Sequence, residues 1–112
     1  MRGIMKIYIS IPISGHDPEE QRAKAERFAK DIDAIGHDPI NPFNVPPPPE
    51  HFNEKERYAY FMGFDIADLL RSDAVYFSRG WEQSKGCRLE HAAAEIYGLK
   101  IFYTLDKIPE AE

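Results

Sequence analysis

The sequence is short of cysteine and of long apolar runs, and each shortage excludes a class of protein. Cys87 is the only cysteine, so no internal disulfide can form. Without a CxxC motif, a structural zinc site also has no ligand pattern. A single thiol is typical of a reducing compartment, which predicts a cytoplasmic protein. No apolar run approaches the roughly 18 residues that a membrane-spanning helix needs.

Basic residues are also fewer than acidic ones. The formal net charge is −5, so electrostatics give no support for a nucleic-acid polymer or an anionic membrane as partner. A small anion in a local pocket stays compatible with this charge. A chain of 112 residues is long enough for one hydrophobic core and too short for two, which predicts a single domain over residues 1–112.

Short apolar runs alternate with helical patterns along the chain. Residues 4–10 are apolar on both faces and lead at once into a turn and a helix, which fits a buried parallel strand better than a signal peptide. Asp17 followed by Pro18 predicts the start of that helix. The expected strands are residues 4–10, 37–41, 73–78 and 99–105, and the expected helices are 18–35, 54–71 and 84 to a C-cap at Gly98. This order predicts a small doubly wound α/β fold, Rossmann- or flavodoxin-like, with a parallel sheet of four or five strands and helices on both faces.

In such folds ligands bind beyond the carboxyl ends of the strands. Those ends carry the segments IPISGH, NPFNV and SRGWEQSKG. The longest irregular stretch, NPFNVPPPPEHFN, contains four consecutive prolines, which fit neither a helix nor a central strand. It is either a linker or an active-site loop. We favour the loop, because a single domain leaves nothing to link.

The spacing of apolar residues predicts the buried face of each helix. The expected buried sets are Ala25, Phe28, Ala29, Ile32 and Ile35 in the first helix, Tyr58, Phe61, Met62, Asp65, Ile66, Leu69 and Leu70 in the second, and Leu89, Ala92, Ala93, Ala94 and Ile96 in the third. Glu90 is expected on the face of the third helix that carries Gly86 and Ala94.

Two acidic residues stand out among these apolar positions. Asp65 interrupts the apolar face of the second helix, so its carboxyl group is paired, turned towards a cavity, or at the rim in water. Glu90 lies one to two turns into the third helix, near the expected pocket, although spacing alone favours a solvated surface glutamate. Two carboxyl groups facing one pocket suit glycosidic chemistry, because one attacks the anomeric carbon and the other assists the leaving group.

Small polar residues mark two loops at the expected ligand-binding edge. Ser84, Lys85 and Gly86 stand at a helix start, where free backbone amides favour an anion. Ser84 as a simple N-cap is the alternative, and both can hold together. Ser14 and Gly15 form a second small loop beside the first helix, which is neither a GxGxxG nor a P-loop pattern.

The remaining candidates are aromatic. Tyr8 is expected to be a core tyrosine whose hydroxyl needs a partner, such as a carboxylate. Trp81 either stacks on a base or caps the edge of the core. The four histidines show no metal-ligand spacing, so no metal and no cofactor are expected; they are His16, His37, His51 and His91.

Three segments carry a family resemblance: KIYISIPISG, DIADLLRSDAVYF and GWEQSKGCRLEHAAAEIYGLKIF. Together they resemble the nucleoside 2-deoxyribosyltransferase superfamily, over nearly the whole chain except the proline-rich loop and the acidic tail. Within it, the chain resembles a short branch common in phages and bacteria (DUF4406-like). The 2′-deoxynucleoside 5′-phosphate N-hydrolases are in the same superfamily.

The resemblance implies a role for each matching position. Glu90 matches the family's nucleophilic glutamate, and Asp65 matches the aspartate that contacts the base and donates a proton. Tyr8 matches the tyrosine that orients the nucleophile. Ser84 stands where the phosphate-preferring hydrolases have a serine, and Gly86, Ser14, Gly15 and Trp81 join it as expected substrate-binding residues.

The activity implied is cleavage of the N-glycosidic bond of a nucleoside, deoxynucleoside or nucleoside 5′-monophosphate, by hydrolysis or by deoxyribosyl transfer. The family usually builds its sites at subunit contacts, which implies a homo-oligomer, a dimer or larger. The sequence departs from the family at Ile11, Pro12, Ser14 and His91, and by one extra residue before Ser84. These departures motivate the alternative of a non-catalytic module that senses a nucleotide or nucleotide sugar.

Overall fold

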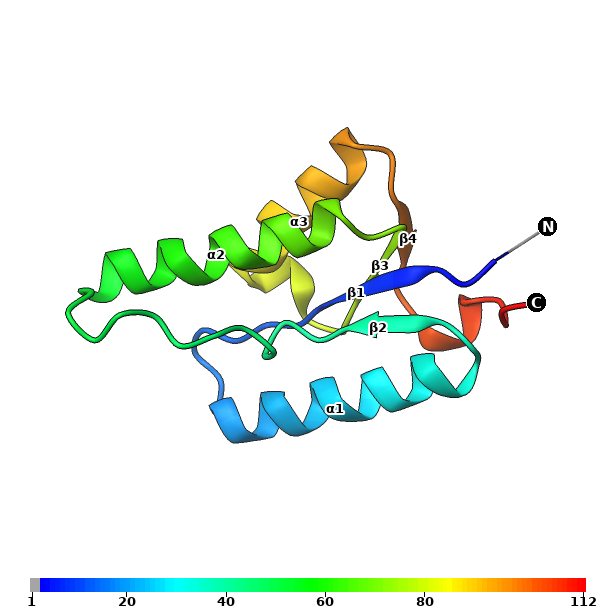
Figure 1. Cartoon of the computed structure of the whole chain (residues 1–112), viewed down its shortest axis with the longest axis horizontal. Coiled ribbons are helices and arrows are strands. Elements are labelled where there is room, and N and C mark those ends of the chain that lie inside the picture. Colours follow the sequence, from blue (N-terminus) through cyan, green and yellow to red (C-terminus); the bar gives the residue numbers. More distant parts are fainter. Residues whose placement is uncertain (1–2) are drawn as a thin grey trace.

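The computed structural model describes residues 3–112 and has the expected α/β architecture (Figure 1). Four parallel strands form one sheet in the order β2-β1-β3-β4, with α1 on one face and α2 and α3 on the other. The strands are β1 (Lys6–Ser10), β2 (Asp38–Ile40), β3 (Ala74–Phe77) and β4 (Lys100–Phe102), and the helices are α1 (Pro18–Ala34), α2 (Glu54–Leu70) and α3 (Lys85–Ile96). The doubly wound fold is therefore confirmed. No helix within the described part of the chain is long and apolar enough to cross a membrane.

The central strand β1 separates two hydrophobic layers. Because side chains alternate along a strand, Ile7 and Ile9 face α1 and pack with Ile32. Tyr8 points to the opposite face, where it packs with Leu69 of α2 and Ala94 of α3. Ser10 follows Tyr8 by two positions and is equally buried. One polar pair of β1 therefore lies under α2 and α3.

Side-chain caps set the helix starts. Asp17 accepts from the backbone N–H of Glu19 at 3.4 Å, and Ser84 accepts from that of Cys87 at 3.2 Å, as the sequence predicts. Asn53 and Glu56 add a reciprocal capping box at the start of α2, with N···O distances of 2.8 and 2.9 Å.

The predicted buried faces of α2 and α3 are partly wrong. Tyr58, Phe61 and Leu70 of α2 are exposed, and only Asp65 and Leu69 are fully buried. For Tyr58 and Phe61 the reason is length: the 17 residues of α2 span about 25 Å, whereas the four residues of β3 span about 13 Å. The first half of α2 therefore extends beyond the carboxyl ends of the strands (Figure 1).

In α3 the buried stripe is shifted from the predicted one. It consists of Cys87, Glu90 and Ala94, while Leu89 is 52% exposed and Ile96 is 77% exposed. Ala93 lies next to this stripe and is partly buried against the core. The fourth strand is also shorter than predicted, because residues 105–107 form a turn of 3-10 helix.

The C-terminal segment is held against the turn between α1 and β2. His37 is buried and accepts from the backbone N–H of Met5 at 3.0 Å through Nδ1, so its Nε2 donates to the carbonyl of Pro109 at 2.6 Å. The backbone N–H of Ala111 donates to the carbonyl of Ile35 at 2.9 Å. Between these bonds, Gly36 has φ +91° and leaves room for Ala111.

We expect Gly36→Ala to destabilise the protein more than Gly98→Ala does. Both glycines have positive φ, which costs an alanine about 1–2 kcal/mol at either position. Only at Gly36 would the new Cβ meet another atom, the Cβ of Ala111 at 2.9 Å, and this overlap adds about 1 kcal/mol or more. Urea unfolding measures both losses, and the double variant with Ala111→Gly should recover the excess. Equal losses for the two single variants would contradict this docking.

Candidate active site

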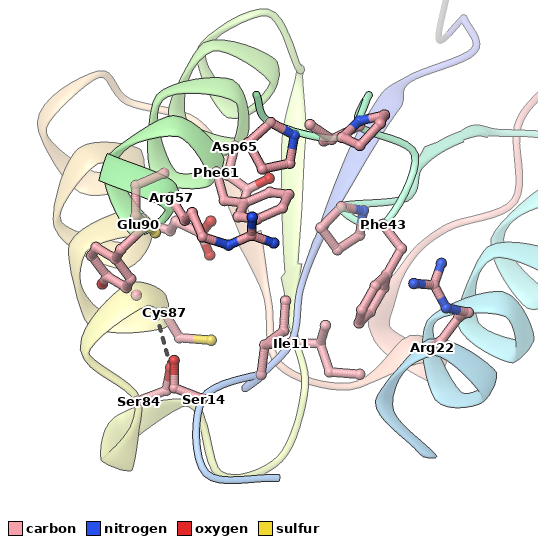
Figure 2. A pocket seen from close by; sticks show the side chains of 18 residues that line it. Ile11, Ser14, Arg22, Phe43, Arg57, Phe61, Asp65, Ser84, Cys87 and Glu90 are labelled. Atoms are coloured by element: carbon pink, nitrogen blue, oxygen red, sulfur yellow. Dashed lines mark hydrogen bonds between the residues drawn. The ribbon is translucent and has the colours of Figure 1, made fainter. Parts of the chain in front are cut away.

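A cavity of about 480 Å³ opens at the carboxyl ends of β1, β2 and β3. Its walls come from the loop after β1, the overhanging half of α2, the start of α3 and the proline-rich loop (Figure 2). The proline-rich loop contributes Phe43 and several prolines to the lining, so it forms a pocket wall rather than a linker. The size and the largely apolar lining suit a small organic ligand.

Glu90 lies at the inner end of this cavity, against the sheet. Its side chain is only 4% exposed, so the interpretation as a solvated surface glutamate is wrong. The hydroxyl of Tyr8 donates to Oε2 at 2.8 Å, and the hydroxyl of Ser10 donates to Oε1 at 2.7 Å. Both donors come from the face of β1 that α2 and α3 cover.

Burial controls the ionisation of Glu90. Removal from water disfavours the charged form and raises the pKa of Glu90 from 4.5 to about 7. The hydrogen bonds from Ser10 and Tyr8 act in the opposite direction, because they favour the carboxylate. Burial and the nearby carboxyl groups hold the pKa of Tyr8 well above 10, so Tyr8 stays a neutral donor.

Asp65 reaches the same cavity from α2. It is 7% exposed, and its Oδ1 has no hydrogen-bond partner among residues 3–112. Burial, reinforced by the charges of Glu90 and Asp68, raises the pKa of Asp65 from 3.8 to about 8. At neutral pH the pair therefore favours an ionised Glu90 beside a protonated Asp65. A buried oxygen without a partner, on a cavity wall, is suited to contact a ligand.

Helix α3 begins at the mouth of the cavity. Ser84 and Gly86 both line the cavity, and Ser84 also caps the helix. A Cβ on Gly86 would stand 3.4 Å from the sulfur of Met62, an ordinary van der Waals contact, so the two helices approach closely here without a strict need for glycine. Ser14 also lines the cavity, whereas Gly15, with φ +82°, belongs to the turn beyond it and is not part of the lining.

Trp81 is not among the residues that line the cavity. It stacks on His91 with ring centroids 4.1 Å apart and an interplanar angle of 17°, and it contacts Phe77 and Tyr103. Of the two interpretations that the sequence left open, the structure supports the cap on the core edge. His91, which departs from the family pattern, is thus a packing partner of Trp81.

Several residues of the site were not predicted from the sequence. Ser10, which contacts Glu90 from beneath the cavity, was missed, although its position two residues after Tyr8 places it on the same strand face. Cys87 is a neutral buried thiol, because burial raises its pKa. Arg57 and Arg22 also line the cavity, and the Arg22 guanidinium lies 4.9 Å from the ring centre of Phe43. A helix pattern alone does not reveal which exposed arginines border a pocket.

Metal-binding geometry is absent from the described residues: no three histidine, cysteine or acidic side chains of residues 3–112 are grouped to hold an ion. The polar side chains that line the cavity are two carboxyl groups, three hydroxyls, one thiol and two guanidinium groups; they belong to Asp65, Glu90, Ser14, Tyr58, Ser84, Cys87, Arg22 and Arg57.

Comparison with known proteins agrees with this fold. A family model described as a domain of unknown function (DUF4406) matches residues 5–103, and a search of curated proteins found no match. Among solved structures, a 2-deoxyribosyltransferase from the psychrotolerant bacterium Bacillus psychrosaccharolyticus, a biocatalyst for nucleoside synthesis, is similar with a TM-score of 0.64. The two are 20% identical, over 86% of this chain and 69% of that one, so the likeness concerns the fold. The chain has the fold of the nucleoside 2-deoxyribosyltransferases and belongs to the DUF4406 family.

Proposed function

We propose that this protein cleaves the N-glycosidic bond of a nucleoside or nucleoside 5′-monophosphate through a covalent glycosyl intermediate on Glu90. The observation that carries the proposal is the division between the two buried carboxyl groups. Glu90 receives two hydrogen bonds that favour its charge, whereas Asp65 has an oxygen without a partner and a pKa of about 8. A nucleophile and a proton donor need this difference.

The first step uses both groups. An oxygen of the Glu90 carboxylate attacks C1′ of the sugar while the bond from C1′ to the base nitrogen breaks. The electron pair of that bond goes to the base, and Asp65 donates its proton there. Tyr8 keeps the attacking carboxylate oriented through its hydrogen bond to Oε2.

The second step returns the enzyme to its starting state. Water attacks C1′, the bond from C1′ to Glu90 breaks, and the electron pair returns to the Glu90 carboxylate. Asp65, now ionised, takes the proton from the water. In a transferase a second base replaces the water and gives its proton to Asp65 in the same way.

The entrance of the cavity favours a negatively charged substrate. Ser84 and Ser14 stand near the start of α3, where the helix dipole attracts an anion. Two arginines, Arg57 and Arg22, line the same cavity in a protein of net charge −5. These groups support a 5′-phosphate on the substrate.

The homo-oligomer that the family resemblance implies stays a prediction.

We expect the protein to release free base from one or more members of a panel of nucleosides, deoxynucleosides and their 5′-monophosphates, followed by chromatography. Glu90→Ala should reduce release by at least about 10³-fold, because it removes the nucleophile. Adding a second base separates transfer from hydrolysis, since a transferase then forms a new nucleoside.

Glu95→Ala is the matched control, because Glu95 lies on the same helix with a side chain that is 65% exposed. It should retain activity. If no substrate releases base but a nucleotide raises the melting temperature, the protein is a sensing module and the enzymatic proposal is wrong.

We expect a bell-shaped dependence of kcat/KM on pH, with its maximum between the pKa of Glu90 at about 7 and that of Asp65 at about 8. Asp65→Asn should lose the basic limb of the profile and about 10²-fold or more of the rate.

A purine nucleoside methylated at N7 already carries a positive charge on its base, so base departure needs no proton. In a single turnover this substrate should restore base release in Asp65→Asn and not in Glu90→Ala, because only the later attack of water still needs Asp65. A failure to restore it would contradict the role of Asp65 as acid.

The buried acid also predicts a stability that falls as pH rises. An acid with a higher pKa in the folded state binds more protons when folded, so the free energy of unfolding decreases between its unfolded pKa of about 4 and its folded pKa of about 8. We expect the free energy of unfolding of Asp65→Asn to exceed that of the wild type by a margin that grows to a few kcal/mol between about pH 5 and pH 9, at about 1.4 kcal/mol per pKa unit. Urea unfolding measures this. Asp33→Asn, on the exposed side of α1, should show no such gain.

A further inference from the structure

Glu90 receives a second hydrogen bond that the proposed mechanism does not use. Tyr8 donates to Oε2, but the hydroxyl of Ser10 donates to Oε1 at the shorter distance of 2.7 Å. Ser10 is 0% exposed, so its hydroxyl does not exchange this partner for bulk water.

Ser10 belongs to the central strand of the sheet. It is the last residue of the central strand, where it is in register with Phe77 of β3. Its carbonyl accepts from the backbone N–H of Ser78 at 3.0 Å. The position of the hydroxyl is therefore set by the sheet, not by a mobile loop.

Two donors on two oxygens restrict the glutamate more than one donor does. The terminal torsion of a glutamate side chain is soft, so a single bond from Tyr8 leaves the carboxylate plane free to rotate. With Ser10 on Oε1 and Tyr8 on Oε2, the plane is fixed. Each oxygen keeps a further lone pair, so attack on a sugar carbon stays possible.

Both hydrogen bonds are stronger when the carboxyl group is charged. In the glycosyl-enzyme the glutamate is a neutral ester, which is a weaker acceptor than a carboxylate. When water displaces it, negative charge returns to the glutamate, and the bond from Ser10 strengthens during that step. An interaction that strengthens towards the transition state accelerates the step.

We infer that Ser10 is a positioning residue that stabilises Glu90 as a departing carboxylate and so speeds breakdown of the glycosyl-enzyme. This inference rests on the proposed function. In the step concerned, water adds to C1′, the bond from C1′ to the glutamate oxygen breaks with its electron pair going to Glu90, and Asp65 takes the proton of the water.

The kinetic test compares wild type with Ser10→Ala, Ser10→Thr and Ser78→Ala. An N7-methylated purine nucleoside at about pH 9 is the substrate, because base departure then needs no proton and Glu90 is ionised in every variant. Ser10→Ala should lower kcat and KM together by roughly tenfold, while kcat/KM changes by less than about threefold. A slower second step alone produces this pattern, because the covalent intermediate accumulates.

Two variants serve as controls. Ser78 is also a buried serine at the end of a strand, but its hydroxyl has no partner within residues 3–112, so Ser78→Ala should behave as wild type. Ser10→Thr keeps the hydroxyl and should restore the kinetics. Mass spectrometry of the quenched reaction should show more enzyme carrying the sugar in Ser10→Ala than in either control. Unchanged kcat, KM and adduct in Ser10→Ala would overturn the inference.

A second measurement separates this inference from the proposed function. NMR titration of the Glu90 Cδ, assigned with Glu90→Gln, needs no substrate. In Ser10→Ala the Glu90 carboxyl group should titrate about one pH unit or more above wild type, because a donor to the charged form is lost. An unchanged titration overturns the inference even if the enzyme is active. A shifted titration in a protein that releases no base would refute the proposed function and the kinetic role of Ser10 with it, but would leave the electrostatic contact between Ser10 and Glu90 established.

Discussion

The burial of Glu90 against the central strand is the interaction on which the rest of the site depends. The glutamate comes from α3, and its two donors lie 80 and 82 residues earlier on β1, so the contact exists only when the sheet and helix are assembled. Its geometry requires the cap at Ser84, which fixes the start of α3. It also places a polar group where a hydrophobic one would pack, because Ala94 and Cys87 continue the same stripe into the core.

The cavity itself follows from a mismatch in length. Strands of three to five residues support only part of a 17-residue helix, so the first half of α2 extends past the sheet and becomes a wall. The proline-rich loop closes the opposite side, because prolines neither donate to a sheet nor continue a helix. Asp65 lies where α2 passes from the sheet to the overhang. This position explains why an acidic residue is buried there and still lines the cavity.

The sequence predicted what depends on local pattern and missed what depends on distant neighbours. The strands, the caps at Asp17 and Ser84, and the interruption of an apolar face by Asp65 are local features. The exposure of Leu89 and Ile96 is not, because apolar residues cover more of α3 than the sheet can bury. Whether Trp81 met a ligand or the core edge depended on His91 and Tyr103, which join it only in the fold.

Burying two carboxyl groups close together costs stability, and it also makes their ionisation differ. Burial raises the pKa of both and is the larger effect at Asp65, where the charge of Glu90 adds to the rise, so the ionised glutamate helps to keep the aspartate protonated. A buried cation beside Asp65 would remove that coupling, since it would favour both negative charges at once. The hydroxyls of Tyr8 and Ser10 are neutral donors, and both favour the charged form of Glu90. Tyr8 also favours the charged form of Asp65, but burial and the charge of Glu90 outweigh this effect there. The difference in ionisation between Glu90 and Asp65 therefore comes from where the neutral donors lie, on the strand face beneath Glu90, and from the absence of any partner for Asp65 Oδ1 among the described residues.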